Sequence, residues 1–218
     1  MKAILLTGLF FLTAIHAAIP SELDAAETSA LLRKLTDARA GKALTARFEE
    51  KKILPMMTEP IFEHGTIAFE PPGKFLRRTQ DGNLAVSNGT TLWMYYPAFS
   101  QVEQYPLDKG GGPGALFSML TQIFELKDVE RQFRATATRT PDGYQLHLLP
   151  RSGSLRKMIG EITLQLDRSL RLRSTKLVGS AGDRIETSYF DEKVVPAGST
   201  DFEFAPAPGA TVVKPLGR

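Results

Sequence analysis

Hydrophobic positions along the chain change their spacing twice, which divides the sequence into an apolar leader, one helix and a series of strands. Residues 3–15 are apolar apart from two threonines and a glycine. Between residues 23 and 35, apolar side chains recur every three or four positions, which predicts an α-helix with a Ser21 cap that closes at Gly41. From Leu44 onward, apolar and polar residues alternate, as in half-buried β-strands.

The alternating segments predict a mainly antiparallel β-sheet of class α+β that forms a single domain over residues 19–218. Asn88-Gly89 lies between two of these segments, and this pair is a strong short-range signal for a β-hairpin. The even spacing of the segments favours a meander that forms a sandwich or a barrel. The expected strands are 44–49, 61–70, 74–79, 84–86, 92–96, 131–138, 144–149, 159–166, 170–178 and 185–190.

Residues 1–18 have the order of a secretory signal peptide. Lys2 precedes the apolar run, and the small residues Ala17 and Ala18 follow it. The run is too short for a membrane anchor, since a transmembrane helix needs about 20 apolar residues. We therefore expect cleavage after Ala17 or Ala18 and release of the mature chain as a soluble exported protein.

Composition excludes several kinds of site. The 218 residues include no cysteine and three histidines, and the formal net charge is +3. A disulfide scaffold, a thiolate metal site and a cysteine nucleophile are therefore excluded, and we expect no metal and no cofactor. The small positive charge does not predict nucleic-acid binding, for which a concentrated basic surface is typical.

Catalytic machinery is not recognisable. His64 and His147 are the histidines of the mature chain, and neither lies in a known catalytic motif. An esterase would need one of them paired with a serine, so we expect the protein not to be an enzyme. Acidic residues of the first two strands, such as Glu50 and Glu63, are interspersed with basic ones including Lys52, which predicts a solvated strand face.

Two segments leave alternatives open. Residues 110–114 read Gly-Gly-Gly-Pro-Gly, and residues 115–124 form an almost wholly apolar helical segment after them. That segment is either a core helix or a lid over a concave sheet, with the glycines as a hinge. Residues 131–184 carry 11 basic against 4 acidic side chains. This excess either docks an acidic partner or an anionic membrane surface, or serves solubility alone.

Three stretches together resemble the LolA-like family of periplasmic lipoprotein carriers. They read GTIAFEPPGKF at 65–75, VSNGTTLWMYYP at 86–97 and FEFAPAPGATV at 202–212. The resemblance spans nearly the whole mature chain in the right order. It implies an unclosed half-barrel sheet covered by helices that enclose an apolar cavity, and it favours the lid interpretation of residues 115–124.

The resemblance also implies a function and partners. Carriers of this family shelter the acyl chains of lipoproteins, receive them from an inner-membrane transporter and pass them to an outer-membrane acceptor. We expect this chain to do so as a monomer. The residues expected to line its lipid-binding cavity are Leu35, Phe48, Ile67, Phe69, Phe75, Trp93, Tyr95, Leu116, Phe117, Leu120 and Phe124.

One departure from the family pattern widens the choice of cargo. Many carriers have an arginine before a proline where this chain has Pro71-Pro72, and that arginine helps to hold the lid closed. Arg77 or Arg78 is the candidate replacement. The alternatives are therefore a carrier of a glycolipid or other lipid for a different export system, and a lipoprotein-sensing module. Sensors are expected to carry a second domain, and this chain ends six residues after Val212.

Overall fold

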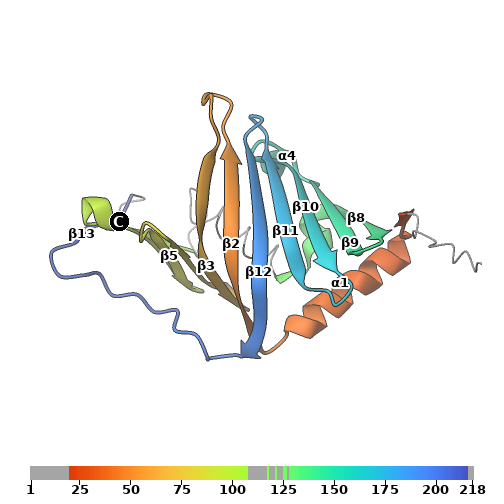
Figure 1. Ribbon diagram of the computed structural model, residues 1–218, viewed down its shortest axis with the longest axis horizontal. Coiled ribbons are helices and arrows are strands. Elements are labelled where there is room, and N and C mark those ends of the chain that lie inside the picture. The colour runs from red at the N-terminus through yellow and green to blue at the C-terminus, as the bar shows by residue number, and fades with distance from the viewer. Residues whose placement is uncertain (1–19, 108–116, 118–120, 122–124, 127, 216–218) are drawn as a thin grey trace, which may run out of the picture.

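One open β-sheet forms most of the protein (Figure 1). The structure is a computed structural model that describes residues 20–107, 117, 121, 125, 126 and 128–215. The strands are β1 (Ser21–Glu22), β2 (Lys42–Ile53), β3 (Ile61–Glu70), β4 (Lys74–Thr79), β5 (Leu84–Asn88), β6 (Thr91–Tyr96), β7 (Gln101–Pro106), β8 (Phe133–Thr140), β9 (Gly143–Pro150), β10 (Ile159–Asp167), β11 (Leu172–Gly179), β12 (Arg184–Pro196) and β13 (Thr211–Val213). Their order in the sheet is β1-β8-β9-β10-β11-β12-β2-β3-β4-β5-β6-β7-β13.

Pairing is antiparallel between all neighbouring described strands except β13, which runs parallel to β7. The longest pairing joins β12 to β2, which brings the C-terminal part of the chain against its first long strand. A mostly antiparallel, open sheet with few helices confirms this part of the predicted fold class. The hairpin at Asn88-Gly89 is also confirmed, since Gly89 has a φ of +94° between β5 and β6.

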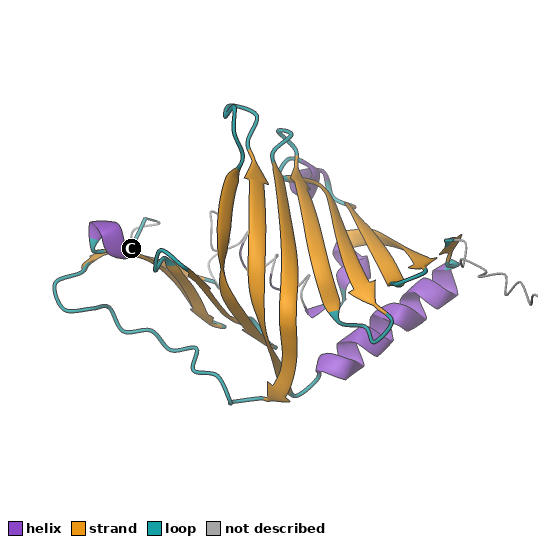
Figure 2. Cartoon of the chain, in the orientation of Figure 1, coloured by secondary structure: helices purple, strands orange, loops and turns teal. Residues whose placement is uncertain are grey.

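Helices are few among the described residues (Figure 2). They are α1 (Ala25–Arg39), α3 (Val129–Gln132), α4 (Gly153–Arg156) and the 3₁₀ turn η1 (Pro97–Phe99). The expectation of a Ser21 cap for α1 was wrong, because Ser21 pairs with Arg139 in the sheet. Asp24 caps the helix instead, and it forms a reciprocal capping box with Glu27 at 2.8 and 3.0 Å.

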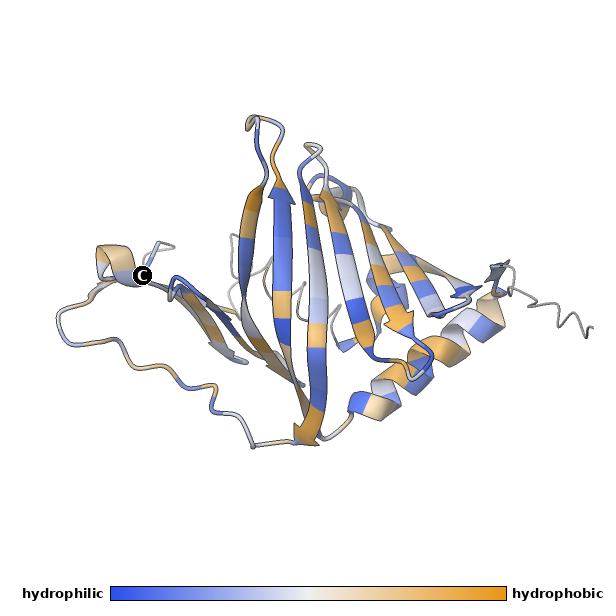
Figure 3. Ribbon diagram, viewed as in Figure 1, coloured by the Kyte–Doolittle hydropathy of each residue, from blue (hydrophilic) through white to orange (hydrophobic). Residues whose placement is uncertain are grey.

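The main core lies where α1 packs on one side of the sheet, which we call the inner face. Leu31, Leu32 and Leu35 of α1 are buried there. The strands of this core contribute apolar side chains from alternate positions. Along β2 and β12, apolar and polar bands are both visible in Figure 3. The buried strand residues of this core include Phe48, Leu146, Leu148, Ile162, Leu164, Leu166 and Tyr189.

The opposite face, which we call the outer face, is apolar over β4 to β7. Val86 and Val102 are fully buried there, and Phe204 from the C-terminal segment packs its ring 6.2 Å from that of Trp93 and 6.0 Å from that of Tyr95. After β12 this segment crosses the molecule to reach β13 (Figure 1). The C-terminal segment therefore buries apolar surface on the outer face that the helices do not cover.

Several predicted boundaries need correction. Strands β1, β7 and β13 were not expected. Arg131 lies in α3 and not in a strand, and Leu170 lies before β11 with a φ of +63°. The predicted leader 1–18, with its cleavage after Ala17 or Ala18, lies outside the described residues, as does most of the predicted helix 115–124.

Candidate functional site

A cavity of about 170 Å³ opens on the inner face between the two halves of the sheet. Strands β2, β3 and β4 form its wall on one side, and β10, β11 and β12 form the other. Most of the lining is aliphatic or aromatic. The lining residues are Phe48, Glu50, Ile67, Phe75, Arg77, Ile162, Leu164, Thr175, Leu177, Ile185, Thr187 and Tyr189. An apolar concave surface with a few convergent polar groups is typical of a ligand-binding site.

Most of the described residues that were predicted to line a lipid cavity gather on this face. Phe48, Ile67 and Phe75 line the cavity itself. Phe117 meets Phe75 edge-on with 5.2 Å between ring centres. Phe69 lines an adjoining hollow of about 40 Å³ together with Ile67. Leu35 lies deeper, in the core beneath α1.

The structure does not bring Trp93 and Tyr95 to this face. Trp93 pairs with Val86, which pairs with Leu76, and residues directly opposite each other point to the same side of a sheet. Leu76 is adjacent to Phe75 along β4 and therefore points the other way. Trp93 and Tyr95 thus lie on the outer face, against Phe204. Leu116, Leu120 and Phe124 lie outside the described residues.

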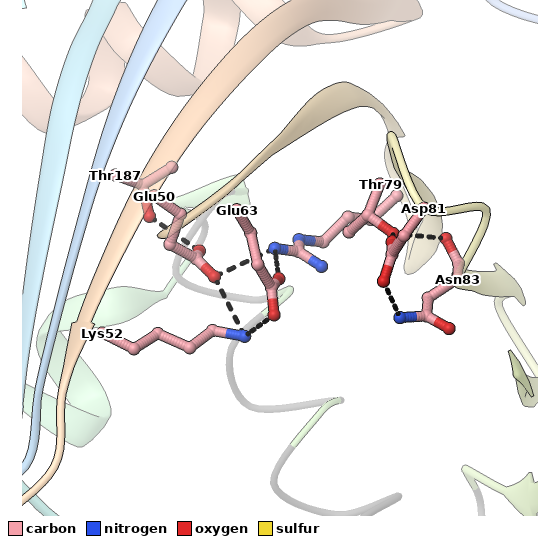
Figure 4. A network of polar contacts seen from close by, with 8 residues as sticks. Glu50, Lys52, Glu63, Thr79, Asp81, Asn83 and Thr187 are labelled. Atoms are coloured by element: carbon pink, nitrogen blue, oxygen red, sulfur yellow. Dashed lines mark hydrogen bonds and ion pairs between the residues drawn. The ribbon is translucent and has the colours of Figure 1, made fainter. Parts of the chain in front are cut away.

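A network of charged side chains interrupts the apolar wall (Figure 4). Arg77 Nη2 donates hydrogen bonds to Glu50 Oε1 at 2.9 Å and to Glu63 Oε2 at 2.6 Å. Lys52 Nζ donates to Glu63 Oε1 at 2.7 Å and forms an ion pair of 3.4 Å with Glu50 Oε1. Thr187 Oγ1 donates to Glu50 Oε2 at 2.9 Å. We call these five residues the polar network.

The polar network is largely shielded from solvent. The Glu50 side chain is 12% exposed and that of Arg77 is 21% exposed. Burial alone would raise the pKa of Glu63, but the hydrogen bonds from Lys52 and Arg77 outweigh it and lower that pKa. The carboxylate of Glu63 is therefore ionised at neutral pH. Within the network, the positive charges of Lys52 and Arg77 are paired with the negative charges of Glu50 and Glu63.

The two arginines considered as replacements for the missing one lie on opposite faces. Arg77 is opposite Ile67 in the register, and its guanidinium carbon lies 4.4 Å from the centre of the Phe48 ring. Arg78 is adjacent in β4, so it points to the outer face and is exposed. Of the two, only Arg77 is in a position to act inside the cavity.

Sequence reasoning assigned Glu50, Lys52 and Glu63 to a solvated strand face, and that assignment was wrong. The position of each within its strand carried the correct signal. Glu50 and Lys52 are two and four residues after Phe48, and Glu63 is four residues before Ile67. An even spacing places each of them on the same side of its strand as the apolar residue.

Other chemistry is not found in the part of the chain that the structure describes. No group of three histidine, aspartate or glutamate side chains there could hold a metal ion. His147 lies 3.0 Å from Glu161 and is next to Leu146 and Leu148, so it points to the outer face. None of the described helices has the length and apolarity to cross a membrane.

The protein is thus an open antiparallel sheet with a mainly apolar cavity on one face, and comparison with known proteins gives its family. The family described as "Outer membrane lipoprotein carrier protein LolA" matches residues 39–204. The chain therefore belongs to the LolA family, as its motifs predicted.

Individual relatives agree with this assignment. An outer-membrane lipoprotein carrier protein of Coxiella burnetii is 31% identical over 157 residues, which cover 69% of this chain and 71% of the relative. One from Bordetella pertussis is 29% identical and covers 79% of this chain and 80% of its own length. A solved structure of an uncharacterized conserved protein from Thermus thermophilus shares the fold, with a TM-score of 0.51, 13% identity, and coverage of 85% of this chain and 98% of that one.

Proposed function

We propose that this protein is a periplasmic carrier that shelters the acyl chains of lipoproteins on its inner face and ferries them from the inner to the outer membrane. The observation that carries the proposal is the coincidence of LolA family membership with the apolar cavity around Phe48 and Phe75. Curated relatives named as outer-membrane lipoprotein carriers support the nature of the cargo.

The physical requirement explains why such a carrier needs a cavity. Each buried CH₂ group contributes about 0.8 kcal/mol, so a triacylated protein cannot cross an aqueous compartment with its chains exposed. The cavity of about 170 Å³ is smaller than the roughly 300–1,000 Å³ of typical small-molecule sites. Loading of three chains therefore requires the inner face to open further.

The proposal includes the export route and the partners. Residues 1–18 direct the chain to the periplasm and are removed after Ala17 or Ala18. An inner-membrane transporter supplies the cargo, and an outer-membrane acceptor receives it. N-terminal sequencing of the protein recovered from the periplasm identifies the cleaved bond, and an uncleaved chain retained in the membrane would contradict this step.

Two measurements test the carrier function. Lipid mass spectrometry of the gently purified mature protein should detect bound acylated cargo, and the protein should release lipoproteins from spheroplasts. Phe75→Ala should weaken both, because this ring lines the cavity. Phe62→Ala is the matched control, since Phe62 is 69% exposed and lies next to Glu63 on the opposite side of β3. Absence of acyl cargo together with failure to release lipoproteins would refute the proposal.

A carrier of a different lipid is the second candidate. Two features favour it, namely Pro71 in place of the arginine common in lipoprotein carriers and the polar network in the cavity wall. Under this alternative, the mass spectra contain a glycolipid or another lipid and the spheroplast assay is negative. We do not propose an enzyme, because His147 is turned away from the cavity toward Glu161.

A further inference from the structure

Each carboxylate of the polar network accepts two hydrogen bonds, whereas Arg77 uses only part of its donor capacity. Glu50 receives hydrogen bonds from Arg77 and Thr187, and Glu63 receives them from Arg77 and Lys52. Arginine has five N–H donors, and the two bonds of Arg77 both come from Nη2. Among the described residues, Arg77 makes these two hydrogen bonds from Nη2 and none from Nε or Nη1. A ligand that completes the network therefore brings an acceptor oxygen.

The guanidinium of Arg77 is fixed before any ligand arrives. Glu50 and Glu63 hold Nη2, and the Phe48 ring lies 4.4 Å from the guanidinium carbon. A planar guanidinium held by carboxylates and an aromatic ring loses little further freedom when it makes another hydrogen bond. The Arg77 side chain is part of the cavity lining, next to Phe48 and Phe75.

The charge of the network indicates which acceptor fits. Arg77 and Lys52 carry two positive charges, and Glu50 and Glu63 carry two negative charges. The carboxylate of Asp81 adds a further negative charge near Arg77, so the site has no excess positive charge to neutralise an anion. Moving a carboxylate into an apolar cavity is costly without an opposite charge, whereas a carbonyl needs only a donor. The site therefore favours a neutral ester or amide carbonyl over a free carboxylate.

We propose that Arg77 is a binding residue for the cargo, donating hydrogen bonds through Nε or Nη1 to an ester or amide carbonyl that joins an acyl chain to its headgroup. The inference rests on the proposed carrier function and deepens it. The aliphatic and aromatic wall takes the hydrocarbon, and the polar network fixes the end of the chain where the carbonyl lies. Glu50 and Glu63 are positioning residues that hold the guanidinium.

A set of matched lipids isolates this hydrogen bond. Monododecanoylglycerol has the ester carbonyl, dodecylglycerol replaces it with an ether, and dodecanoate replaces it with a carboxylate. Each competes with a neutral fluorescent probe for the mature protein. We expect the wild type to bind the ester about tenfold more tightly than the ether, as for a hydrogen bond to a charged donor. Dodecanoate should also bind more weakly than the ester.

Substitutions then locate the donor. Arg77→Met should remove the preference for the ester while the ether still binds. Arg78→Met is the matched control, because it removes the same group from the opposite side of β4, and it should keep the preference. If Arg77→Met fails to fold, the charge-balanced double variant Arg77→Met with Glu63→Gln provides the same comparison, since Lys52 still pairs with Glu50.

The outcomes separate this inference from the carrier function. Failure of all three lipids to bind the wild type would refute the carrier proposal. Binding of ester and ether with equal affinity would leave the carrier intact and refute a role for Arg77 at a carbonyl. Tighter binding of dodecanoate than of the ester would also refute it, because the site would then select an anion.

Discussion

The backbone amide of Gly73 donates a hydrogen bond of 2.8 Å to the carboxylate of Glu125, which lies 52 residues later in the chain. Gly73 has a φ of +65° in the turn between β3 and β4, and the hydroxyl of Ser87 donates to its carbonyl at 2.8 Å. Phe117 contacts Phe75 just beyond the same turn. Phe117 and Glu125 therefore both contact the segment around Gly73 and Phe75, at one end of the inner face.

Loss of the Glu125 carboxylate should release this turn. In Glu125→Ala, hydrogen exchange at the Gly73 amide should accelerate about tenfold, because a hydrogen bond to a charged acceptor is lost. Glu125→Gln is the control, since its side-chain carbonyl can still accept from Gly73. Equal exchange at Gly73 in the wild type and the alanine variant, measured by NMR, would contradict the contact.

Glu70 should make folding stability depend on pH. It is 4% exposed and accepts hydrogen bonds from Lys74 Nζ at 2.8 Å and from the Gly198 amide at 2.7 Å. The hydrogen bond from Lys74 has the largest effect on the pKa of Glu70 and lowers it, and the one from Gly198 lowers it further. Burial acts to raise this pKa, but its effect is smaller. The folded state thus favours the carboxylate. The contribution of ionised Glu70 to folding stability is complete above the pKa of glutamate in the unfolded chain, about 4.3. This contribution is lost as the pH falls through the lower pKa that Glu70 has in the folded protein.

Glu70→Gln is the corresponding variant. At pH 7 it should lower the free energy of unfolding by about 1–3 kcal/mol, and the difference from the wild type should shrink as the pH falls below about 4. Urea titrations at a series of pH values measure both effects. Glu59→Gln, in the exposed β2–β3 loop, should follow the wild type throughout. A stability difference that grows as the pH falls would contradict a lowered pKa of Glu70 in the folded protein.

The C-terminal segment should contribute to stability through the outer face. Phe202 is 4% exposed, and Phe204 packs on Trp93 and Tyr95. Phe202→Ala should cost about 3–5 kcal/mol, as for other buried phenylalanines. Phe99→Ala is the comparison, because Phe99 is 79% exposed and its loss should have little effect. Similar urea midpoints for the two variants would indicate that the segment is not packed as described.

Gly65 should not tolerate a side chain. It is opposite Phe48 in the register, and a Cβ at this position would overlap the carbonyl group of Arg78. Gly65→Ala should therefore destabilise the sheet by about 3 kcal/mol, because the clash is with backbone. At Gly153, a Cβ would approach only the Nη2 atom of Arg156, at 3.9 Å. Gly153→Ala should stay within about 0.5 kcal/mol of the wild type in thermal unfolding.

Local patterns were sufficient for most of the sheet and failed where two signals competed. The alternation in β2 and β3 and the turn at Asn88-Gly89 predicted strands that the structure contains. Ser21 is a good capping residue by type, but Asp24 has a glutamate three residues later and forms the reciprocal box. Strand β7 is held by its hydrogen bonds to β6 and β13, a stabilisation that no local pattern records.

The candidate site was harder to predict because a strand pattern does not say which face is inner. Strand β6 reads Thr-Leu-Trp-Met-Tyr-Tyr, so both of its faces are apolar and alternation cannot choose between them. Trp93 and Tyr95 were assigned to the cavity for this reason, and they pack on Phe204 instead. The polar network was missed because Thr187 lies 137 residues from Glu50, and only the strand register brings them together.

The parallel pairing of β13 with β7 has a consequence for self-association. An open sheet leaves unsatisfied backbone groups along its border strands, and these groups can recruit a strand from another molecule. Here β13 covers three residues of β7, and β1 covers two residues of β8 at the other border. Each border strand is therefore too short to template a long intermolecular ladder. Deletion of residues 211–213 should uncover β7 and promote concentration-dependent dimers joined strand to strand, detectable by analytical ultracentrifugation.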